Sequence, residues 1–444
     1  AKVIAAASRL KIIGRAGVGV DNVDVPAATQ RGVLVVNSPE GNTIAAAEHA
    51  LAMMLSLSRH VPQANAGMRA GKWDRKKYVG NELYKKTLGV VGLGKIGSHV
   101  AKVAQAMGME VIAYDPFIAA DRAKQMQVRL IELDELFRTA DYVTLHIPRT
   151  KDTENLVNAD LLRTMKPTAR IVNCARGGVV DEAAISEAIN QGVIAGAGLD
   201  VYATEPLAED SPLRAVERGL VLTPHLGAST EEAQENVAVD VAEQIRDVLL
   251  GLPARSAVNI PGLSAEIMER LKPHLQLAET VGLLVSQLAG GHVKEMELRL
   301  QGEFASHPSQ PLVIAALKGL LSAALGDSIN FVNASLEAKA RGINVLEVKD
   351  ETSRDFAGGS LQITTRGDQG DRCVTGAVFA DGELRITSID EFPVNVSPSR
   401  HMLFTRHRDM PGIIGHLGSM MGEHNVNIAS MQVGRKIVRG DAVM

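Results

Sequence analysis

Three glycines recur at a spacing that suits phosphate binding, in the run Gly92-Leu93-Gly94-Lys95-Ile96-Gly97. The residues from 87 to 91 are typical of a buried strand, and apolar residues at helical spacing follow from Ile96 to Met107. Between a strand and a helix, such a turn lets a pyrophosphate approach the free N–H groups and positive dipole of the helix start. The run therefore predicts a dinucleotide site, whereas a glycine-rich connector without a ligand is the alternative.

Asp115 stands about 20 residues beyond these glycines, where a second strand-like run ends. A carboxylate at this place can accept hydrogen bonds from the adenosine ribose hydroxyls and would repel a 2′-phosphate. The residue therefore predicts NAD as the cofactor rather than NADP. The alternative role is local, because Asp-Pro also forms turns.

Three further side chains follow strand-like runs and together could move a proton and hold a substrate. His225, in Pro224-His225-Leu226-Gly227, is a candidate general acid/base. Arg176 could bind a carboxylate with both guanidinium arms, and the two glycines after it would make room for the ligand. Glu205 could pair with the imidazole and favour its protonated form. Because a lone His or Arg is often structural, the prediction of hydride transfer at a 2-hydroxy acid depends on all three.

Asp200 ends another strand-like run, where it could meet the nicotinamide amide or simply form a turn. Cys174 lies in the same loop as Arg176 but beside no obvious base. We therefore interpret Cys174 as a packed thiol rather than a nucleophile.

These residues need a scaffold that brings several strand ends together, and the pattern from about residue 87 to 223 provides one. Strand-like runs alternate there with helical stretches, which predicts βαβ units and a Rossmann-type doubly wound parallel sheet. The runs after the glycine motif are 110–115, 142–146, 170–173, 195–200 and 221–223. Two more buried strands, at 10–14 and 33–37, and helices at 45–57 and 230–249 predict a partner lobe.

Beyond Pro261 the residue pattern changes. Helices are predicted near 265–289 and 311–325 and a strand at 360–365, without a catalytic motif. Residues 402–444 are expected to form a strand, a Pro-Gly turn, a helix, a strand, a turn and the start of a strand. The sequence thus predicts further α+β structure after the sheet domain.

Composition narrows the class of protein. The 444 residues exceed what one core usually supports, so two to four domains are expected. A formal charge of −4 gives little support for binding nucleic acid or a membrane surface. The two cysteines, Cys174 and Cys373, suit a reducing compartment, and no signal peptide, membrane span or metal-ligand spacing is predicted. We therefore expect a cytoplasmic protein without a metal.

Four motifs in order, at 92–97, 173–178, 199–206 and 224–227, resemble those of the D-isomer-specific 2-hydroxyacid dehydrogenases. The resemblance implies that Arg176, Glu205 and His225 are the catalytic residues and that Arg15 joins Arg176 and His225 at the substrate. It implies an NAD site in this sheet domain. The implied cofactor contacts are Gly92, Gly94, Lys95, Ile96, Gly97, Asp115, His146, Ile147, Pro148, Cys174, Ala175, Asp200, Gly227 and Ala228.

Within that family, the runs 14–24 and 228–230 resemble the long form of the branch that oxidises 3-phosphoglycerate, the first step of L-serine biosynthesis. The resemblance implies a homotetramer and four regions. These are a flavodoxin-like substrate lobe at 1–40 and 232–260, the NAD domain at 41–231, an intervening allosteric-substrate-binding domain at 261–396, and a ferredoxin-like ACT domain at 397–444. His407, Asp409 and Asn427 resemble contacts to an L-serine effector. Compared with the family, the start lacks roughly 50 residues of the substrate lobe, and the end lacks the last helix and strand of the ACT fold.

Several other functions remain open from the sequence. Another dehydrogenase of the family could act on glyoxylate, hydroxypyruvate or 2-oxoglutarate with the same three residues. The fold also serves non-enzymatic corepressors, in which the Arg, Glu and His set would be idle. An amino-acid sensor without turnover is the third alternative.

Overall fold

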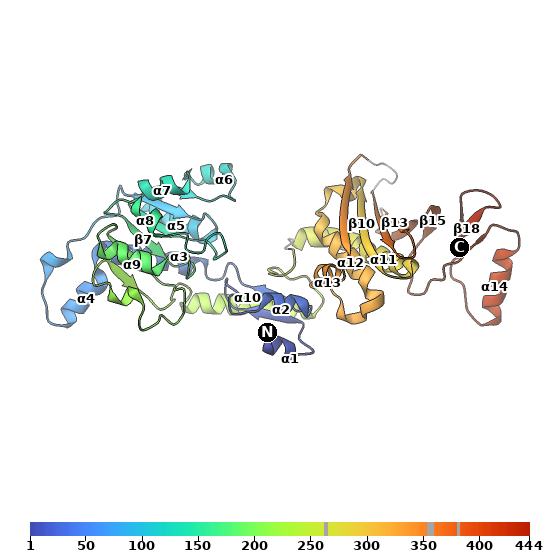
Figure 1. The fold of residues 1–444 in the computed structure, drawn as a ribbon, viewed down its shortest axis with the longest axis horizontal. Helices are drawn as coiled ribbons and strands as arrows, with labels where there is room; N and C mark the ends of the chain where they lie inside the picture. Colours follow the sequence, from blue (N-terminus) through green and yellow to red (C-terminus); the bar gives the residue numbers. More distant parts are fainter. Residues whose placement is uncertain (262–264, 353–358, 380–381) are drawn as a thin grey trace. The chain divides into compact units, whose positions relative to one another are not determined.

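The computed structural model describes residues 1–261, 265–352, 359–379 and 382–444 (Figure 1). Contacts between residues divide the chain into two compact units. One comprises Ala16–Gly19 and Ser38–Ala242, and the other comprises Ala1–Arg15, Val20–Asn37 and Glu243–Met444.

The first of these units is built on a sheet of seven parallel strands in the order β5-β4-β3-β6-β7-β8-β9. The strand order reverses direction between β3 and β6, which makes this point the topological switch of a doubly wound fold. The predicted Rossmann-type sheet is therefore confirmed. The strands are β3 (Thr87–Val91), β4 (Glu110–Tyr114), β5 (Arg129–Leu130), β6 (Tyr142–Leu145), β7 (Arg170–Asn173), β8 (Gly196–Leu199) and β9 (Leu220–Leu222).

Helices cover both faces of this sheet. On one face, side chains of α3 and α5 join a core with Leu88 and Val90 of β3. On the other face, α7, α8 and α9 pack with Val91 and Ile171. The helical segments are α3 (Thr43–Arg59), α4 (Val61–Arg69), η1 (Arg75–Tyr78), α5 (Lys95–Ala106), α6 (Ala120–Gln125), α7 (Leu133–Thr139), α8 (Ala159–Arg163), α9 (Glu182–Asn190), η2 (Pro212–Ala215) and α10 (Glu231–Leu249).

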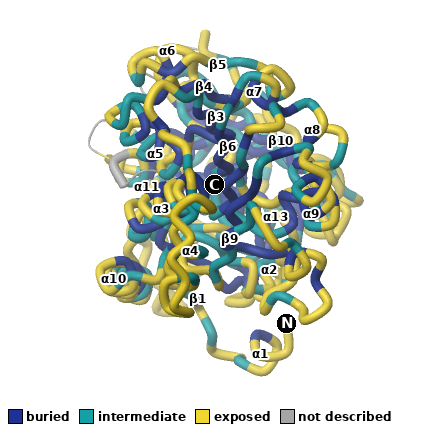
Figure 2. Tube along the Cα trace, turned by 90° about the vertical axis from the view of Figure 1, so that its left-hand side faces the viewer, coloured by how far each residue is buried: buried dark blue, intermediate teal, exposed yellow. Residues whose placement is uncertain are grey.

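The side-chain pattern explains why these segments fold as they do. Successive strand residues point to opposite faces, so β6 is buried along its whole length between the two helical layers. In α5, Val100, Ala101 and Ala104 are buried on one face, as the predicted helical spacing requires. By contrast, no residue of α4 is buried, and the tube of Figure 2 is yellow along much of this helix.

The second unit contains a pair of parallel strands, β1 (Ile12–Arg15) and β2 (Leu34–Asn37), with helices α1 (Lys2–Ala6) and α2 (Val25–Gln30). The Asp24 side chain accepts a hydrogen bond from the Ala27 amide at 3.0 Å and so caps α2. The two strands predicted at 10–14 and 33–37 are thus confirmed, with starts shifted by one or two residues.

A six-stranded sheet, in the order β11-β10-β12-β13-β14-β15, dominates the described part of this unit after residue 261. Only β10 and β11 of this sheet pair in parallel. Its strands are β10 (Val293–Gln301), β11 (Asn344–Asp350), β12 (Ser360–Gly367), β13 (Arg372–Val378), β14 (Leu384–Ile389) and β15 (Phe392–Val396). The helical segments are α11 (Ala265–Ala289), η3 (Gly302–Ser306), α12 (Ser309–Leu325), η4 (Gly326–Ser328) and α13 (Ala334–Ala340).

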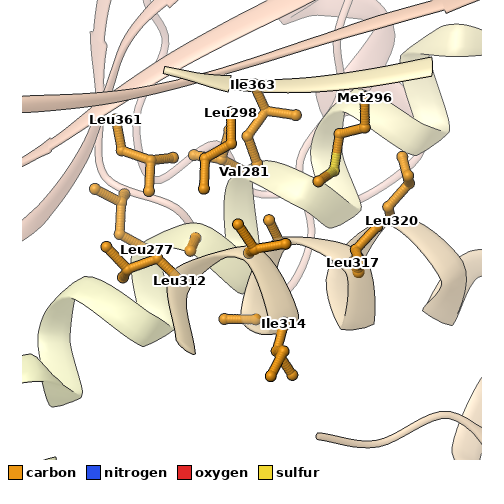
Figure 3. Close-up of a cluster of buried hydrophobic side chains, with 14 of the residues drawn as sticks. Leu277, Val281, Met296, Leu298, Leu312, Ile314, Leu317, Leu320, Leu361 and Ile363 are labelled. Atoms are coloured by element: carbon orange, nitrogen blue, oxygen red, sulfur yellow. The ribbon is translucent and has the colours of Figure 1, made fainter. Parts of the chain in front are cut away.

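Helices α11 and α12 cover this sheet with an aliphatic core (Figure 3). The labelled core residues are Leu277, Val281, Met296, Leu298, Leu312, Ile314, Leu317, Leu320, Leu361 and Ile363. The stretch Ser309–Ser328 is long and apolar enough to cross a membrane, but α12 within it packs in this core, which accounts for its composition.

The last segment forms a small antiparallel sheet in the order β16-β18-β17, accompanied by one helix. Its elements are β16 (Arg406–Arg408), α14 (Ile413–Glu423), β17 (Gly434–Arg435) and β18 (Asp441–Val443). The order of strand, helix, strand and strand confirms the expected partial ferredoxin-like pattern.

Close contact between α11 and α12 depends on two glycines. A Cβ atom at Gly282 would overlap the carbonyl oxygen of Ala316, and one at Gly319 would overlap that of Glu279. We expect Gly319→Ala to lower the free energy of unfolding of this domain by about 1–3 kcal/mol, because the helices must move apart. Urea denaturation followed by circular dichroism measures the change.

The matched control is Gly415→Ala in α14, where a Cβ would meet no atom within 4 Å. Removing an exposed helical glycine there should leave stability equal or raise it by up to about 1 kcal/mol. Equal losses in both variants would show that close helix packing is not the cause.

Candidate active site

Each glycine of the 92–97 run has a distinct role at the switch point of the sheet. Gly92 has a left-handed φ of 93°, and a Cβ there would lie 2.5 Å from the carbonyl oxygen of His146. At Gly97 a Cβ would overlap the Gly92 carbonyl oxygen, so this glycine allows α5 to approach the strand. Gly94 has open space and precedes the first turn of α5. This arrangement suits a pyrophosphate at the helix start.

Asp115 follows β4 and holds the glycine turn through its own carboxylate. Its Oδ2 accepts a hydrogen bond from the Leu93 amide at 2.7 Å, and its Oδ1 accepts from the Phe117 amide at 2.9 Å. The predicted ribose acceptor therefore also organises the phosphate loop. Lys95, at the start of α5, forms an ion pair with Glu40.

The next strand along the sheet, β6, is followed by His146, Ile147 and Pro148. Ile147 lies over the glycine turn, since a Cβ at Gly92 would be 2.9 Å from its Cγ2 atom. The His146 ring is 3.0 Å from the Thr144 hydroxyl, and burial lowers the pKa of His146 to about 4. This histidine is therefore neutral near pH 7 and adds no charge to the cofactor site.

The loop after β7 carries Cys174, Ala175 and Arg176. Asn173 fixes the loop, because its side chain donates to the Arg176 carbonyl at 3.0 Å and accepts from the Ala175 amide at 3.0 Å. The Arg176 Nη1 atom donates to the Ala175 carbonyl at 2.7 Å. Burial, followed by the charge of Asp200, raises the pKa of the Cys174 thiol, which makes it a poor nucleophile.

The two glycines after Arg176 lie against other parts of the protein. A Cβ at Gly177 would overlap the Tyr202 carbonyl oxygen, and one at Gly178 would lie 2.9 Å from the Arg149 guanidinium. Protein atoms therefore occupy the side of each glycine on which a side chain would lie. These glycines allow the loop after β7 to pack tightly against the one after β8.

Asp200 follows β8, and its carboxylate is fully buried. Its Oδ1 accepts from the Leu226 amide at 2.7 Å, and its Oδ2 accepts from the Gly227 amide at 2.9 Å. Burial alone would raise the pKa of Asp200, but hydrogen bonds from His49, Thr223 and Leu226 lower it below its usual value. The ionised side chain is thus an internal acceptor for the loop after β9.

His225, in the loop after β9, is paired with Glu205. The His225 Nδ1 atom lies 2.7 Å from Glu205 Oε2, and Glu205 Oε1 accepts from the Tyr202 amide at 3.1 Å. His225 has a left-handed φ of 55°, supported by a hydrogen bond from its amide to the Asp200 carbonyl at 2.9 Å. A proton on Nδ1 leaves Nε2 as the basic nitrogen of the neutral ring.

The structure brings the three predicted catalytic residues to one edge of the sheet. Strands β7, β8 and β9 are neighbours, and Arg176, Glu205 and His225 lie in the loops after them. The Cys174 carbonyl oxygen would be 3.9 Å from a Cβ at Gly227, so the first and third loops meet. Ala228 continues the third loop and accepts a hydrogen bond from Gln234 at 2.9 Å. Arg15 ends β1 in the other unit.

The predicted effector residues lie in the small C-terminal sheet and beside it. His407 belongs to β16, and its Nδ1 atom is 3.5 Å from the Thr405 hydroxyl. Asp409 accepts from the Arg439 amide at 3.1 Å and pairs with Arg435 at 2.8 Å, and these two contacts lower its pKa. Asn427 is exposed beyond α14.

Two residues at the site were missed by the sequence reasoning. Tyr202 donates its hydroxyl proton to the carbonyls of Leu199 and Thr223, at 3.0 and 2.8 Å. His49 of α3 contacts Asp200. In the sequence, the only sign of this role was that His49 is a polar residue within the mostly apolar run 45–57. His49, Cys174 and Asp200 also place ligand atoms within 4.8 Å of one another, which sequence spacing could not show.

Comparison with known families matches two parts of the chain. Residues 51–227 match the D-isomer specific 2-hydroxyacid dehydrogenase, NAD binding domain, and residues 270–390 match the D-3-phosphoglycerate dehydrogenase intervening domain. The chain is similar to the D-3-phosphoglycerate dehydrogenase of Synechocystis, with 64% identity over 100% of this chain and 80% of that protein. The enzyme of the same name from Archaeoglobus fulgidus is 45% identical over 98% of this chain and 82% of its own length.

Solved structures are similar to more than half of the chain. The TT0316 protein of Thermus thermophilus has a TM-score of 0.54 and 38% identity, covering 58% of this chain and 81% of that one. D-Lactate dehydrogenase of Aquifex aeolicus, solved with NAD and lactic acid, has a TM-score of 0.53 and 30% identity, covering 59% and 84%. The chain belongs to the D-isomer-specific 2-hydroxyacid dehydrogenases, in their D-3-phosphoglycerate dehydrogenase branch.

Proposed function

We propose that this NAD-dependent oxidoreductase oxidises 3-phospho-D-glycerate at C2 to 3-phosphooxypyruvate, the first step of L-serine biosynthesis. One observation carries the chemistry: His225 and Glu205 pair at 2.7 Å at the carboxyl edge of the NAD-binding sheet. The similarity to D-3-phosphoglycerate dehydrogenases over the whole chain supports the choice of substrate.

Proton transfer falls to His225 in this proposal. Its Nε2 atom takes the proton from the C2 hydroxyl during oxidation, while Nδ1–H remains bound to Glu205. The Glu205 carboxylate stabilises the imidazolium that forms and fixes the ring orientation through its second contact with the Tyr202 amide. NAD, when bound, accepts the hydride that leaves C2.

Arg176 is proposed to hold the substrate carboxylate and the C2 oxygen. Guanidinium binds a carboxylate through two parallel hydrogen bonds, which orients C2 as well as neutralising charge. The contacts from Asn173 keep the Arg176 backbone in place beside the cofactor loop. Arg15 is proposed as a further substrate contact from the partner lobe.

The predicted cofactor residues line strand ends around the switch point, and we propose that they bind NAD together. Gly94 and the start of α5 receive the pyrophosphate, and Asp115 receives the adenosine ribose. Ile147 lies over the glycine turn, where it would contact the cofactor.

We also propose the four regions set out from the sequence, with a regulatory ACT domain that binds L-serine through His407, Asp409 and Asn427. The Arg435 side chain beside Asp409 would have to share this carboxylate with a serine ammonium group.

A cytoplasmic homotetramer is the proposed assembly. Exposed apolar side chains on and after α4, such as Trp73 at 80% and Val79 at 77%, support burial against another subunit.

The decisive experiment follows NAD reduction at 340 nm with a panel of 2-hydroxy acids, with and without L-serine. We expect the largest kcat/KM with 3-phosphoglycerate and inhibition by serine. Preference for D-lactate, glycolate, glycerate or 2-hydroxyglutarate would assign the chain a different reaction within the family. Serine binding by calorimetry without any turnover would make it a sensor.

Removing the proposed base should affect chemistry more than cofactor binding. We expect His225→Gln to lower kcat by about 10²–10⁴-fold while the Kd for NADH, measured by fluorescence titration, stays nearly constant. Unchanged turnover would remove His225 from the mechanism.

Asp115 tests the ribose contact and the loop contact separately. Asp115→Ala should weaken NAD binding and reduce the preference for NAD over NADP. The change removes both the negative charge and the acceptor for the Leu93 amide. Asp115→Asn retains a neutral acceptor and should narrow the preference with a smaller loss of NAD affinity. If kcat/KM falls equally for both cofactors in both variants, the ribose contact is misplaced.

A further inference from the structure

Helix α3 presents one stripe of side chains to the sheet beneath the proposed catalytic loop. His49, Met53 and Leu57 are spaced by four residues and therefore share a helix face. A Cβ at Gly198 would lie 3.1 Å from Leu57 and 3.4 Å from Met53, so β8 approaches this stripe closely. The packing fixes α3 against the strand that leads into Asp200.

The His49 imidazole reaches the Asp200 carboxylate directly. Its Nε2 atom lies 3.1 Å from Asp200 Oδ1 and 3.2 Å from the Thr223 hydroxyl, and the His49 side chain is only 19% exposed. Thr223 donates its hydroxyl proton to the same Oδ1 atom at 2.6 Å. His49 is therefore the contribution of α3 to a network that otherwise connects the loops after β8 and β9.

The donor direction in this network is determined by charge. An ionised carboxylate only accepts hydrogen bonds, so the proton must sit on His49 Nε2. The His49 Nε2–H then lies 3.1 Å from the carboxylate on one side, beside the Thr223 hydroxyl that donates to it, and the Leu226 and Gly227 amides donate on the other side. Because Asp200 is fully buried, losing one donor removes a bond that water cannot readily replace.

The two backbone donors lead directly to the reacting imidazole. Leu226 and Gly227 immediately follow His225, and the His225 amide itself donates to the Asp200 carbonyl at 2.9 Å. The left-handed backbone of His225 is unfavourable for a residue with a side chain, so surrounding contacts must hold it. A shift of the Asp200 carboxylate would thus move the loop that aims His225.

We propose that His49 is a positioning residue for the dehydrogenase reaction: its Nε2–H fixes the Asp200 carboxylate, which in turn holds the loop bearing His225. The inference rests on the proposed function for its kinetic consequence. It does not require His49 to touch either the substrate or NAD.

The same cluster has a second interpretation as a metal site, because Cys174 Sγ lies within 4.8 Å of the His49 and Asp200 ligand atoms. Both carboxylate oxygens already accept hydrogen bonds, and His49 Nε2 carries the proton that a metal would displace. The contacts therefore favour a closed hydrogen-bonded cluster.

The test compares two replacements of His49 in the full chain. His49→Leu removes the donor and should lower kcat by about 10–100-fold, because small misplacement of a catalytic group has effects of this size. The KM for 3-phosphoglycerate should change by less than about 3-fold, since Arg176 holds the carboxylate. His49→Gln supplies an amide N–H near the Nε2 position and should recover kcat to within about 5-fold of the native chain.

Glu48→Gln is the matched control, because Glu48 is the adjacent, exposed residue of the same helix. It should leave kcat unchanged. Native kcat in His49→Leu would overturn the proposal, and so would equal losses in the Leu and Gln variants. Dialysis against EDTA should leave the native activity intact. A loss that Zn²⁺ restores would favour the metal interpretation and overturn ours.

Amide hydrogen exchange at Leu226 and Gly227 separates this inference from the proposed reaction. His49→Leu should accelerate exchange at both amides by at least about tenfold, corresponding to about 1.4 kcal/mol of lost protection, whereas Glu48→Gln should not. If the native chain oxidises no 2-hydroxy acid, the proposed function is wrong. The exchange measurement would still show whether His49 stabilises the hydrogen bonds of the Leu226 and Gly227 amides. Unaltered exchange in His49→Leu would overturn the positioning role, whatever the activity.

Discussion

The Asp200 carboxylate is a buried charge that connects three parts of the NAD-binding unit. Helix α3 supplies His49, the loop after β9 supplies Thr223, Leu226 and Gly227, and the carboxylate itself follows β8. A buried charge is tolerated only when hydrogen bonds replace its hydration. The ionised Asp200 carboxylate is therefore stable only while these elements remain together. The same hydrogen bonds fix the loop that carries His225.

Close backbone approach is the second constraint on the site. Gly97 lets α5 reach the glycine turn, and Gly177 lets the loop after β7 rest on the Tyr202 carbonyl. Neither position has room for a side chain. Tight loop packing and the Asp200 network therefore place the guanidinium of Arg176 and the imidazole of His225 on two loops that meet at one edge of the sheet.

The chain beyond residue 261 is stabilised independently of this site. Its largest core lies between α11, α12 and a mainly antiparallel sheet, and the C-terminal sheet has its own strand pairing. Separate cores of this kind allow one domain to change conformation without unfolding the other.

Local patterns in the sequence were sufficient for the parallel sheet, the glycine turn, the strand-end positions of Arg176, Glu205 and His225, and most helices. These features depend on periodicity and turn chemistry, which are encoded by neighbouring residues. Contacts between distant segments could not be predicted in the same way. His49 lies far from Asp200 in sequence, and Gly177 was assigned to a ligand although it accommodates the Tyr202 carbonyl. Which side chains share a buried charge, and which glycines face protein rather than ligand, was decided only by tertiary packing, because both depend on atoms that the fold brings together.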